Sequence, residues 1–228
     1  MSEQAGGRSV IGPPSSLDAE FVSDTLRLSQ ARTATAISRA AAHRRAQPNG
    51  WWGMALFLCS EVTLFGTLIG SYFYLDFKDA RWPPAGISEP STLKPSVSTG
   101  VLVAMSIPLW LAVRQARAGR KGHVLGLITL AFWVQLAYLG FQIWQLIGNL
   151  HHFLPHSSAY GSIYYTLLVA HHAHVLFGLV LDVSVFAFVA IRGLDNYWLI
   201  GVRGLAMYWY VVNGLAVAVL LTTLSPSL

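Results

Sequence analysis

The sequence has little charge and almost no cysteine. Only 11% of its 228 residues are charged and 54% are hydrophobic, whereas about a quarter of the residues in a typical soluble domain are charged. This composition excludes an ordinary water-soluble domain and is typical of a membrane protein. The single cysteine, Cys59, excludes a disulfide framework and any metal site that needs two thiolates. The net charge of +5 does not predict a nucleic-acid partner, because the basic residues gather beside the apolar segments.

The first 49 residues lack the features of a targeting sequence. They are rich in Ala, Arg and Ser, and no apolar stretch of about 7–15 residues follows a basic start, as a signal peptide requires. We therefore expect residues 1–49 to form a mostly disordered cytoplasmic tail. Residues 50–228 are then expected to form a separate transmembrane domain.

Five apolar segments are long enough to cross a bilayer, because roughly 20 apolar residues span about 30 Å as a helix. We therefore predict an all-α, polytopic bundle of five transmembrane helices. Aromatic residues flank the first segment, as is common at membrane interfaces, and Pro108 is expected to kink the second. The predicted spans are 51–75, 97–113, 123–147, 163–191 and 204–224.

The distribution of Lys and Arg predicts the orientation of the bundle. With the N-terminus inside, the inner segments carry six of these residues in the tail, four in the second connection and two in the fourth, and the outer segments carry three. Cytoplasmic segments are enriched in Lys and Arg. We therefore predict that the N-terminus lies inside and the C-terminus outside. The expected location of this multi-pass protein is the inner cell membrane.

One carboxyl lies in the middle of the first predicted span. Counted at 1.5 Å per residue from Trp51, Glu61 lies about 15 Å into the membrane, where a charge costs at least about 2.5–3.5 kcal/mol. Such a group needs a partner, a proton or a polar cleft. Gly66 and Gly70 form a G-x-x-x-G pair, which favours close helix packing. Because Glu61 points roughly 140° away from Gly66, we expect it to face a different helix.

Other polar residues are predicted at the same depth as Glu61 or near it. In the fourth span, two histidines, a glycine and an aspartate fall within about 80° of one another and form one stripe. These residues are His171, His174, Gly178 and Asp182. Because polar side chains avoid lipid, we predict a buried polar network centred on Glu61. Its other predicted members are Gln135, Tyr138, His171, His174, Asp182 and Asn213.

Short motifs in a fixed order carry a resemblance to a known family. They are Gly53-Met54, Ser60-Glu61-Val62, Trp82-Pro83-Pro84 with Gly86-Ile87, Tyr160-Gly161-Ser162, His171 with His174-Val175, and Tyr208-Trp209. Over residues 51–224 the chain resembles subunit III of the haem-copper oxidases, in a five-helix form that lacks the first two of seven helices. It departs from the family pattern at Tyr138, His172, Tyr210 and Asn213.

The resemblance implies an accessory subunit of an aerobic respiratory oxidase such as cytochrome c oxidase. Such a subunit would have no redox centre of its own and no catalytic or metal-binding residues, with haem and copper held by partner subunits. The implied partners are oxidase subunits I and II and membrane phospholipids. The implied function is to stabilise the catalytic subunit and to support proton uptake during oxygen reduction, so the polar network would be proton-linked.

Three alternatives remain open at this point. The chain could be the related subunit of a nitric oxide reductase. It could be a small proton or ion transporter that uses Glu61, His174 and Asp182. It could also be a membrane di-metal enzyme, because His152-x-x-x-His156 and His171-His172-x-His174 loosely resemble the histidine boxes of hydroxylases. Imidazole groups alone are able to bind several metals.

Overall fold

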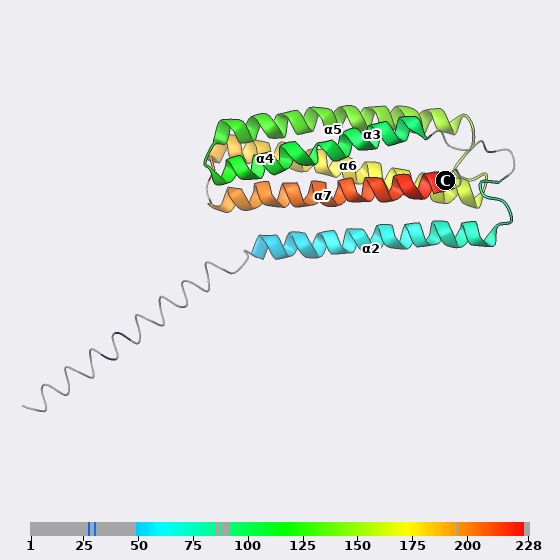
Figure 1. Ribbon diagram of the computed structural model, residues 1–228, viewed down its shortest axis with the longest axis horizontal. Coiled ribbons are helices and arrows are strands. Elements are labelled where there is room, and N and C mark those ends of the chain that lie inside the picture. Colours follow the sequence, from blue (N-terminus) through cyan, green and yellow to red (C-terminus); the bar gives the residue numbers. More distant parts are fainter. Residues whose placement is uncertain are drawn as a thin grey trace, which may run out of the picture. The chain divides into compact units, whose positions relative to one another are not determined.

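A computed structural model describes residues 49–84, 87, 92–194 and 196–225, together with Arg27 and Gln30. The chain divides into two compact units, Met1–Gln47 and Pro48–Leu228. Except for Arg27, Gln30 and Asn49, the predicted tail of residues 1–49 lies outside the described residues. The paragraphs below concern the second unit, which contains all the helices labelled in Figure 1.

The second unit is a bundle of long helices. The described residues contain helices and no strands, and five helical segments are long and apolar enough to cross a membrane. The predicted all-helical, multi-pass fold with five spans is therefore confirmed. Most helices extend past the predicted bounds, because polar residues continue each helix beyond the apolar core. The helices are α2 (Asn49–Lys78), α3 (Leu93–Ala104), α4 (Ser106–Arg117), α5 (Lys121–Leu150), α6 (Ala159–Arg192) and α7 (Asn196–Leu224).

The second span, Leu93–Arg117, is broken into α3 and α4 at Met105. The cause is Pro108, which has no N–H to donate to the carbonyl of Ala104 four residues earlier. At the break, the Met105 N–H donates to the Leu102 carbonyl three residues earlier, at 3.1 Å, in a tighter turn. The kink expected from Pro108 is therefore present, and it lies one turn before the proline.

The start of α6 is set by local sequence. The Ser158 hydroxyl accepts a hydrogen bond from the Gly161 N–H at 3.0 Å, which caps the helix. A Cβ atom at Gly161 would lie 2.7 Å from the Leu154 carbonyl oxygen, so only glycine allows the preceding loop to approach this closely. The Tyr160-Gly161-Ser162 motif is therefore explained by the loop that it anchors.

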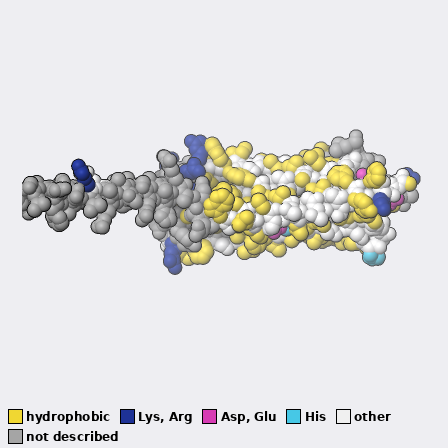
Figure 2. Space-filling model, turned by 90° about the horizontal axis from the view of Figure 1, so that it is seen from below, with side chains coloured by type: hydrophobic (Ala, Val, Ile, Leu, Met, Phe, Trp, Pro, Cys, Tyr) yellow, Lys and Arg dark blue, Asp and Glu magenta, His cyan; other side chains and the backbone are white. Residues whose placement is uncertain are grey.

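Helix α7 lies inside the bundle, and helix α2 lies at its edge. Among the described helices, α7 contacts α2, α3, α4 and α6, whereas α2 contacts α6 and α7 alone and lies at the edge (Figure 1). The inner face of α2 is formed by Leu58, Phe65 and Tyr72, which are buried. On the face shown in Figure 2, Lys and Arg side chains lie toward the ends of the bundle, with hydrophobic side chains between them.

Aromatic side chains connect α2 to α6 near the end of α2. The Trp82 ring lies 5.4 Å from that of Tyr72 and 5.0 Å from that of Tyr160, measured between ring centroids. The peptide bond between Trp82 and Pro83 is cis, and the Pro84 carbonyl accepts a hydrogen bond from the Ile87 N–H. The Trp82-Pro83-Pro84 motif thus places an indole between the first and fourth spans.

Candidate functional site

The midplane carboxyl is paired with a histidine of α6. Glu61 Oε2 lies 2.5 Å from His174 Nε2, and the two side chains are 19% and 16% exposed. The other ring nitrogen, Nδ1, lies 2.7 Å from the Ala170 carbonyl oxygen of the preceding turn. Phe65 of α2 covers the imidazole with its ring edge at 5.1 Å between centroids. Glu61 therefore faces α6 and links it to α2; the sequence predicted only that Glu61 points away from Gly66.

The two contacts of His174 fix how many protons the pair holds. A carbonyl oxygen only accepts, so Nδ1 carries a proton and donates it to Ala170. The remaining contact, between Nε2 and the Glu61 carboxyl, needs one shared proton. Whether that proton resides on oxygen or nitrogen, the pair has no net charge. A neutral pair is the arrangement that costs least inside a membrane.

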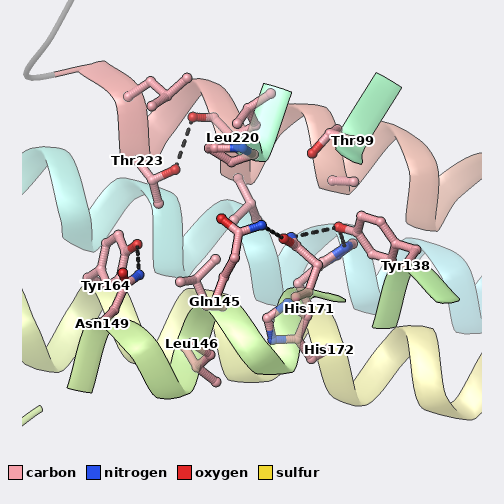
Figure 3. A pocket seen from close by; sticks show the side chains of 16 residues that line it. Thr99, Tyr138, Gln145, Leu146, Asn149, Tyr164, His171, His172, Leu220 and Thr223 are labelled. Carbon is pink, nitrogen blue, oxygen red and sulfur yellow. Dashed lines mark hydrogen bonds between the residues drawn. The ribbon is translucent and has the colours of Figure 1, made fainter. Parts of the chain in front are cut away.

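A second cluster lies between α5 and α6. The Tyr138 hydroxyl is 3.3 Å from His171 Nε2 and accepts a hydrogen bond from Gln142 Nε2 at 3.1 Å. Gln145 Nε2 in turn donates to Gln142 Oε1 at 3.1 Å. Dashed lines in Figure 3 mark these contacts. The cluster is a hydrogen-bonded chain that runs from the midplane toward the C-terminal end of α5.

Sequence reasoning missed Gln142 and Gln145, although a signal for them was present. Residues 135, 138, 142, 145 and 149 of α5 are Gln, Tyr, Gln, Gln and Asn, spaced alternately by three and four. This spacing places all five on one face of a helix. Depth in the membrane was used to select Gln135 and Tyr138, and depth alone does not identify the rest of a face.

A third cluster surrounds Asp182, which is almost fully buried. Trp209 Nε1 of α7 donates to Asp182 Oδ1 at 3.2 Å. The Gln135 amide of α5, with its nitrogen toward the carboxyl, reaches Oδ2 at 2.8 Å and the Ala131 carbonyl at 3.1 Å. A Cβ atom at Gly178 would lie 2.6 Å from Trp209 Cζ2. Gly178 therefore makes the space through which the indole reaches Asp182.

Asn213 has a partner outside the predicted network. Its Nδ2 donates to Ser106 Oγ at 2.9 Å, at the start of α4 beside the break after α3. The motif residue Tyr208, also on α7, donates its hydroxyl hydrogen to the His174 carbonyl at 2.7 Å. Both contacts connect α7 to its neighbours.

The residues predicted to form one network are thus divided among separate contacts. Glu61 pairs with His174, Tyr138 with His171, Gln135 with Asp182, and Asn213 with Ser106. Within the described ranges, no hydrogen bond joins one pair to another. The predicted stripe of α6 is also split, because His174 faces α2 while His171 and Asp182 face α5. The prediction of a single network centred on Glu61 is therefore corrected to a single pair, Glu61 with His174. Among the described helices, α2 contacts α6 and α7 and does not contact α5, which carries Gln135 and Tyr138.

The part of the chain that the structure describes contains no group of three or more His, Cys, Asp or Glu residues able to hold a metal ion.

The two glycines of the G-x-x-x-G pair lie on the exposed face of α2, and a Cβ atom at Gly66 or Gly70 would meet nothing within 4 Å. The close helix contact predicted at these glycines is therefore not made with any described residue of this chain.

Comparison with known proteins identifies the family. A family model described as cytochrome c oxidase subunit III matches residues 33–223. Cytochrome c oxidase subunit 3 of Bacillus subtilis is 30% identical over 151 residues, which are 65% of this chain and 72% of that protein. Subunit 3 of the cytochrome bo(3) ubiquinol oxidase of Pseudomonas aeruginosa is 29% identical over 64% of this chain and 70% of that protein.

A further relative is longer than this chain. Cytochrome c oxidase subunit 3 of Pisaster ochraceus is 26% identical over 152 residues. These residues are 64% of this chain and 56% of the sea-star protein, so the chain spans little more than half of that relative's length. The family match covers most of the chain and extends from before the first span to one residue before the end of the fifth. The chain belongs to the cytochrome c oxidase subunit III family.

Proposed function

We propose that this protein is the accessory subunit III of an aerobic respiratory haem-copper oxidase. The observation that carries the proposal is the family match over residues 33–223. The relatives include subunits named for cytochrome c oxidase and for ubiquinol oxidase. The proposal therefore extends to oxygen reduction by a haem-copper complex and leaves the electron donor unspecified.

The proposed partners are the oxidase subunits I and II and membrane phospholipids. Haem and copper would be held by the partner subunits, and this chain would contribute packing surface and polar side chains. The exposed face of α2 around Gly66 and Gly70 supports a contact with a helix of another subunit, because small residues let helices approach closely.

The proposed orientation in the inner cell membrane has the N-terminus inside and the C-terminus outside. One end of the bundle combines the end of α4, the start of α5 and the end of α6 with a set of basic residues. These are Arg114, Arg117, Arg120, Lys121, Arg192 and Arg203. At the opposite end, Lys78 and Arg81 are accompanied by Asp76 and Asp79. Basic residues favour the cytoplasmic side. An alkaline phosphatase fused after Leu228 should be active, and activity of a cytoplasm-only reporter there would contradict this orientation.

The proposed role of the Glu61–His174 pair is to hold α2 against the bundle without a net charge. The pair joins α2 to α6 near the midplane, and α2 has no other helix to contact besides α7. A change in the shared proton would alter both the charge and the contact. This property supports a smaller, proton-linked contribution to turnover by the neighbouring catalytic subunit.

The test is purification of the tagged full-length chain from its own membranes in a mild detergent. We expect it to bring with it a haem protein that consumes oxygen, with metal and haem assigned to the other subunits after they are separated. Recovery of the chain alone, with proton or ion transport when it is placed in vesicles, would overturn the proposal. So would one Fe, Cu or Zn per chain in the separated subunit.

A further inference from the structure

A pocket of about 80 Å³, lined by both polar and apolar side chains, lies among α3, α5, α6 and α7. One of its ends is where these helices begin or finish: Pro95 is near the start of α3, and Asn149 and Thr223 are near the ends of α5 and α7. At the other end the pocket reaches His171 and Tyr138. Gln145 and Asn149 are partly exposed, whereas His171 and His172 are buried. The pocket is therefore a narrow well from one end of the bundle to its middle (Figure 3).

Three nitrogen atoms on the wall of this well have no partner within the described part of the chain. They are Nδ1 of His171 and both ring nitrogens of His172. His171 is 2% exposed and His172 is 8% exposed. A neutral imidazole has one N–H donor and one acceptor nitrogen, so His172 lacks both of its hydrogen bonds.

His171 Nδ1 lacks a hydrogen-bond partner in either neutral form of the ring. If the Tyr138 hydroxyl donates to Nε2, then Nδ1 carries a hydrogen and needs an acceptor. If Nε2 donates to Tyr138, then Nδ1 is an acceptor and needs a donor. Buried polar groups of this kind are usually paired with protein or with ordered water. Water can satisfy either state, because it both donates and accepts.

The wall also contains apolar side chains, among them Leu146, Leu168 and Leu220, but several further polar groups on it suit water. The amides of Gln142, Gln145 and Asn149 and the hydroxyls of Tyr138 and Tyr164 line it and are held in place by hydrogen bonds of 3.0–3.1 Å to one another. No Lys, Arg, Asp or Glu residue is among its described lining residues. A neutral cavity with several fixed donors and acceptors binds water rather than an ion or an acyl chain.

We propose that this pocket is a hydrated well that binds a file of ordered water molecules and connects the imidazoles of His171 and His172 to the aqueous phase at the α5 C-terminal end of the bundle. The pocket extends no further than Tyr138 and His171, and Leu102 and Leu179, further along α3 and α6, belong to the buried apolar core. The proposed well is therefore blind at this end. Water therefore reaches the middle of the membrane from one side only. This inference does not depend on the proposed function.

Reactivity of introduced cysteines tests the well directly. In a Cys59→Ser background, Thr99→Cys on α3 and His172→Cys on α6 place a thiol on its wall. Leu102→Cys and Leu179→Cys are matched controls on the same two helices, each buried in the apolar core. Silver ion is added to sealed vesicles, and the thiols that remain free are counted afterwards with a maleimide in denaturant. His156→Cys, in the exposed loop after α5, marks the side on which the well opens.

We expect Thr99→Cys and His172→Cys to react at least about tenfold faster than their controls, and only from the side on which His156→Cys reacts. Thr99→Cys exchanges groups of nearly equal size, so it keeps the test valid if His172→Cys does not fold. The proposal is overturned if folded Thr99→Cys reacts as slowly as Leu102→Cys. It is also overturned if the well thiols react equally from both sides.

Discussion

Helices α2 and α7 are almost equally long and equally suited to cross a membrane, yet the bundle uses them differently. In their most apolar stretches, 50% of α7 is buried within the protein, against 11% of α2. α7 contributes Trp209 to the buried Asp182 cluster. α2 contributes Glu61 to a pair that remains partly exposed. Hydropathy alone therefore identifies a span without indicating whether lipid, a partner or the core surrounds it.

The comparison separates two kinds of polar contact. The Asp182 cluster joins α5, α6 and α7, which form the core, so losing it should weaken the chain itself. The Glu61–His174 pair joins the core to an edge helix, so losing it should weaken the attachment of α2 and of whatever packs on α2. Substitutions in the two contacts should therefore affect different measurements.

The largest effect is expected for Gly178→Ala. Its new Cβ would lie 2.6 Å from Trp209 Cζ2, so the indole must move and release Asp182. Overpacking of this kind costs about 1–3 kcal/mol, and the melting temperature of the purified chain in detergent should fall clearly. Gly214→Ala is the matched control on α7, because a Cβ there meets nothing within 4 Å. Equal melting temperatures for both variants would mean that α6 and α7 are not held as described.

The next largest effect is expected for Trp209→Phe. The ring is kept in large part, but the N–H donor to Asp182 Oδ1 is lost, which leaves a buried carboxyl oxygen without this partner. An unpaired buried polar group costs about 1–3 kcal/mol. The loss should be recovered in part when Asp182→Leu is added, because the carboxyl is then removed as well. If the double variant is less stable than either single variant, Asp182 has another function in the core.

The fold was predictable from sequence because its main determinant is local. An apolar run of about 20 residues forms a helix in a membrane, since a helix pairs all the backbone groups of one segment within that segment. The break at Met105 also follows from a single residue, Pro108. The predicted helices were too short because each prediction stopped at the first polar residues. The helices of the structure continue past these residues, as at Lys121 and Arg192.

The sequence predicted the level of the site residues in the membrane, but not which helix each side chain contacts. Glu61 and His174 were placed at one level, and the structure pairs them. Asn213 was placed at the same level and instead contacts Ser106, at the start of α4. Which faces meet depends on the packing of all the helices, and one sequence gives no measure of it. The polar face of α5 could have been found from its three-and-four spacing.

A smaller effect is expected for Glu61→Ala, which removes the partner of His174. The pair is partly exposed, so the free energy of unfolding of the isolated chain should fall by only about 1 kcal/mol. The larger result should be looser association with the catalytic subunit, measured as haem recovered with the tagged chain. Glu61→Gln can donate to His174 Nε2 and should assemble like the unmodified protein, with a slight decline of oxygen consumption over many turnovers. If Glu61→Ala assembles and turns over normally at every pH tested, neither the structural nor the proton-linked role holds.

The smallest effect on the isolated chain is expected for Gly66→Leu, on the opposite face of the same helix. Its side chain would meet no described residue, so the melting temperature should stay within experimental error of the unmodified chain. If a helix of another subunit packs on this face, the added bulk should separate the two helices and reduce the haem that co-purifies. Gly100→Leu on α3, where a Cβ also meets nothing within 4 Å, controls for the cost of a new leucine in any span. A melting temperature lowered as far as that of Gly178→Ala would place α2 in the core and end the distinction between the two helices. An unchanged haem yield would instead assign the exposed face of α2 to lipid, because a face that tolerates leucine at its glycine has no helix pressed against it.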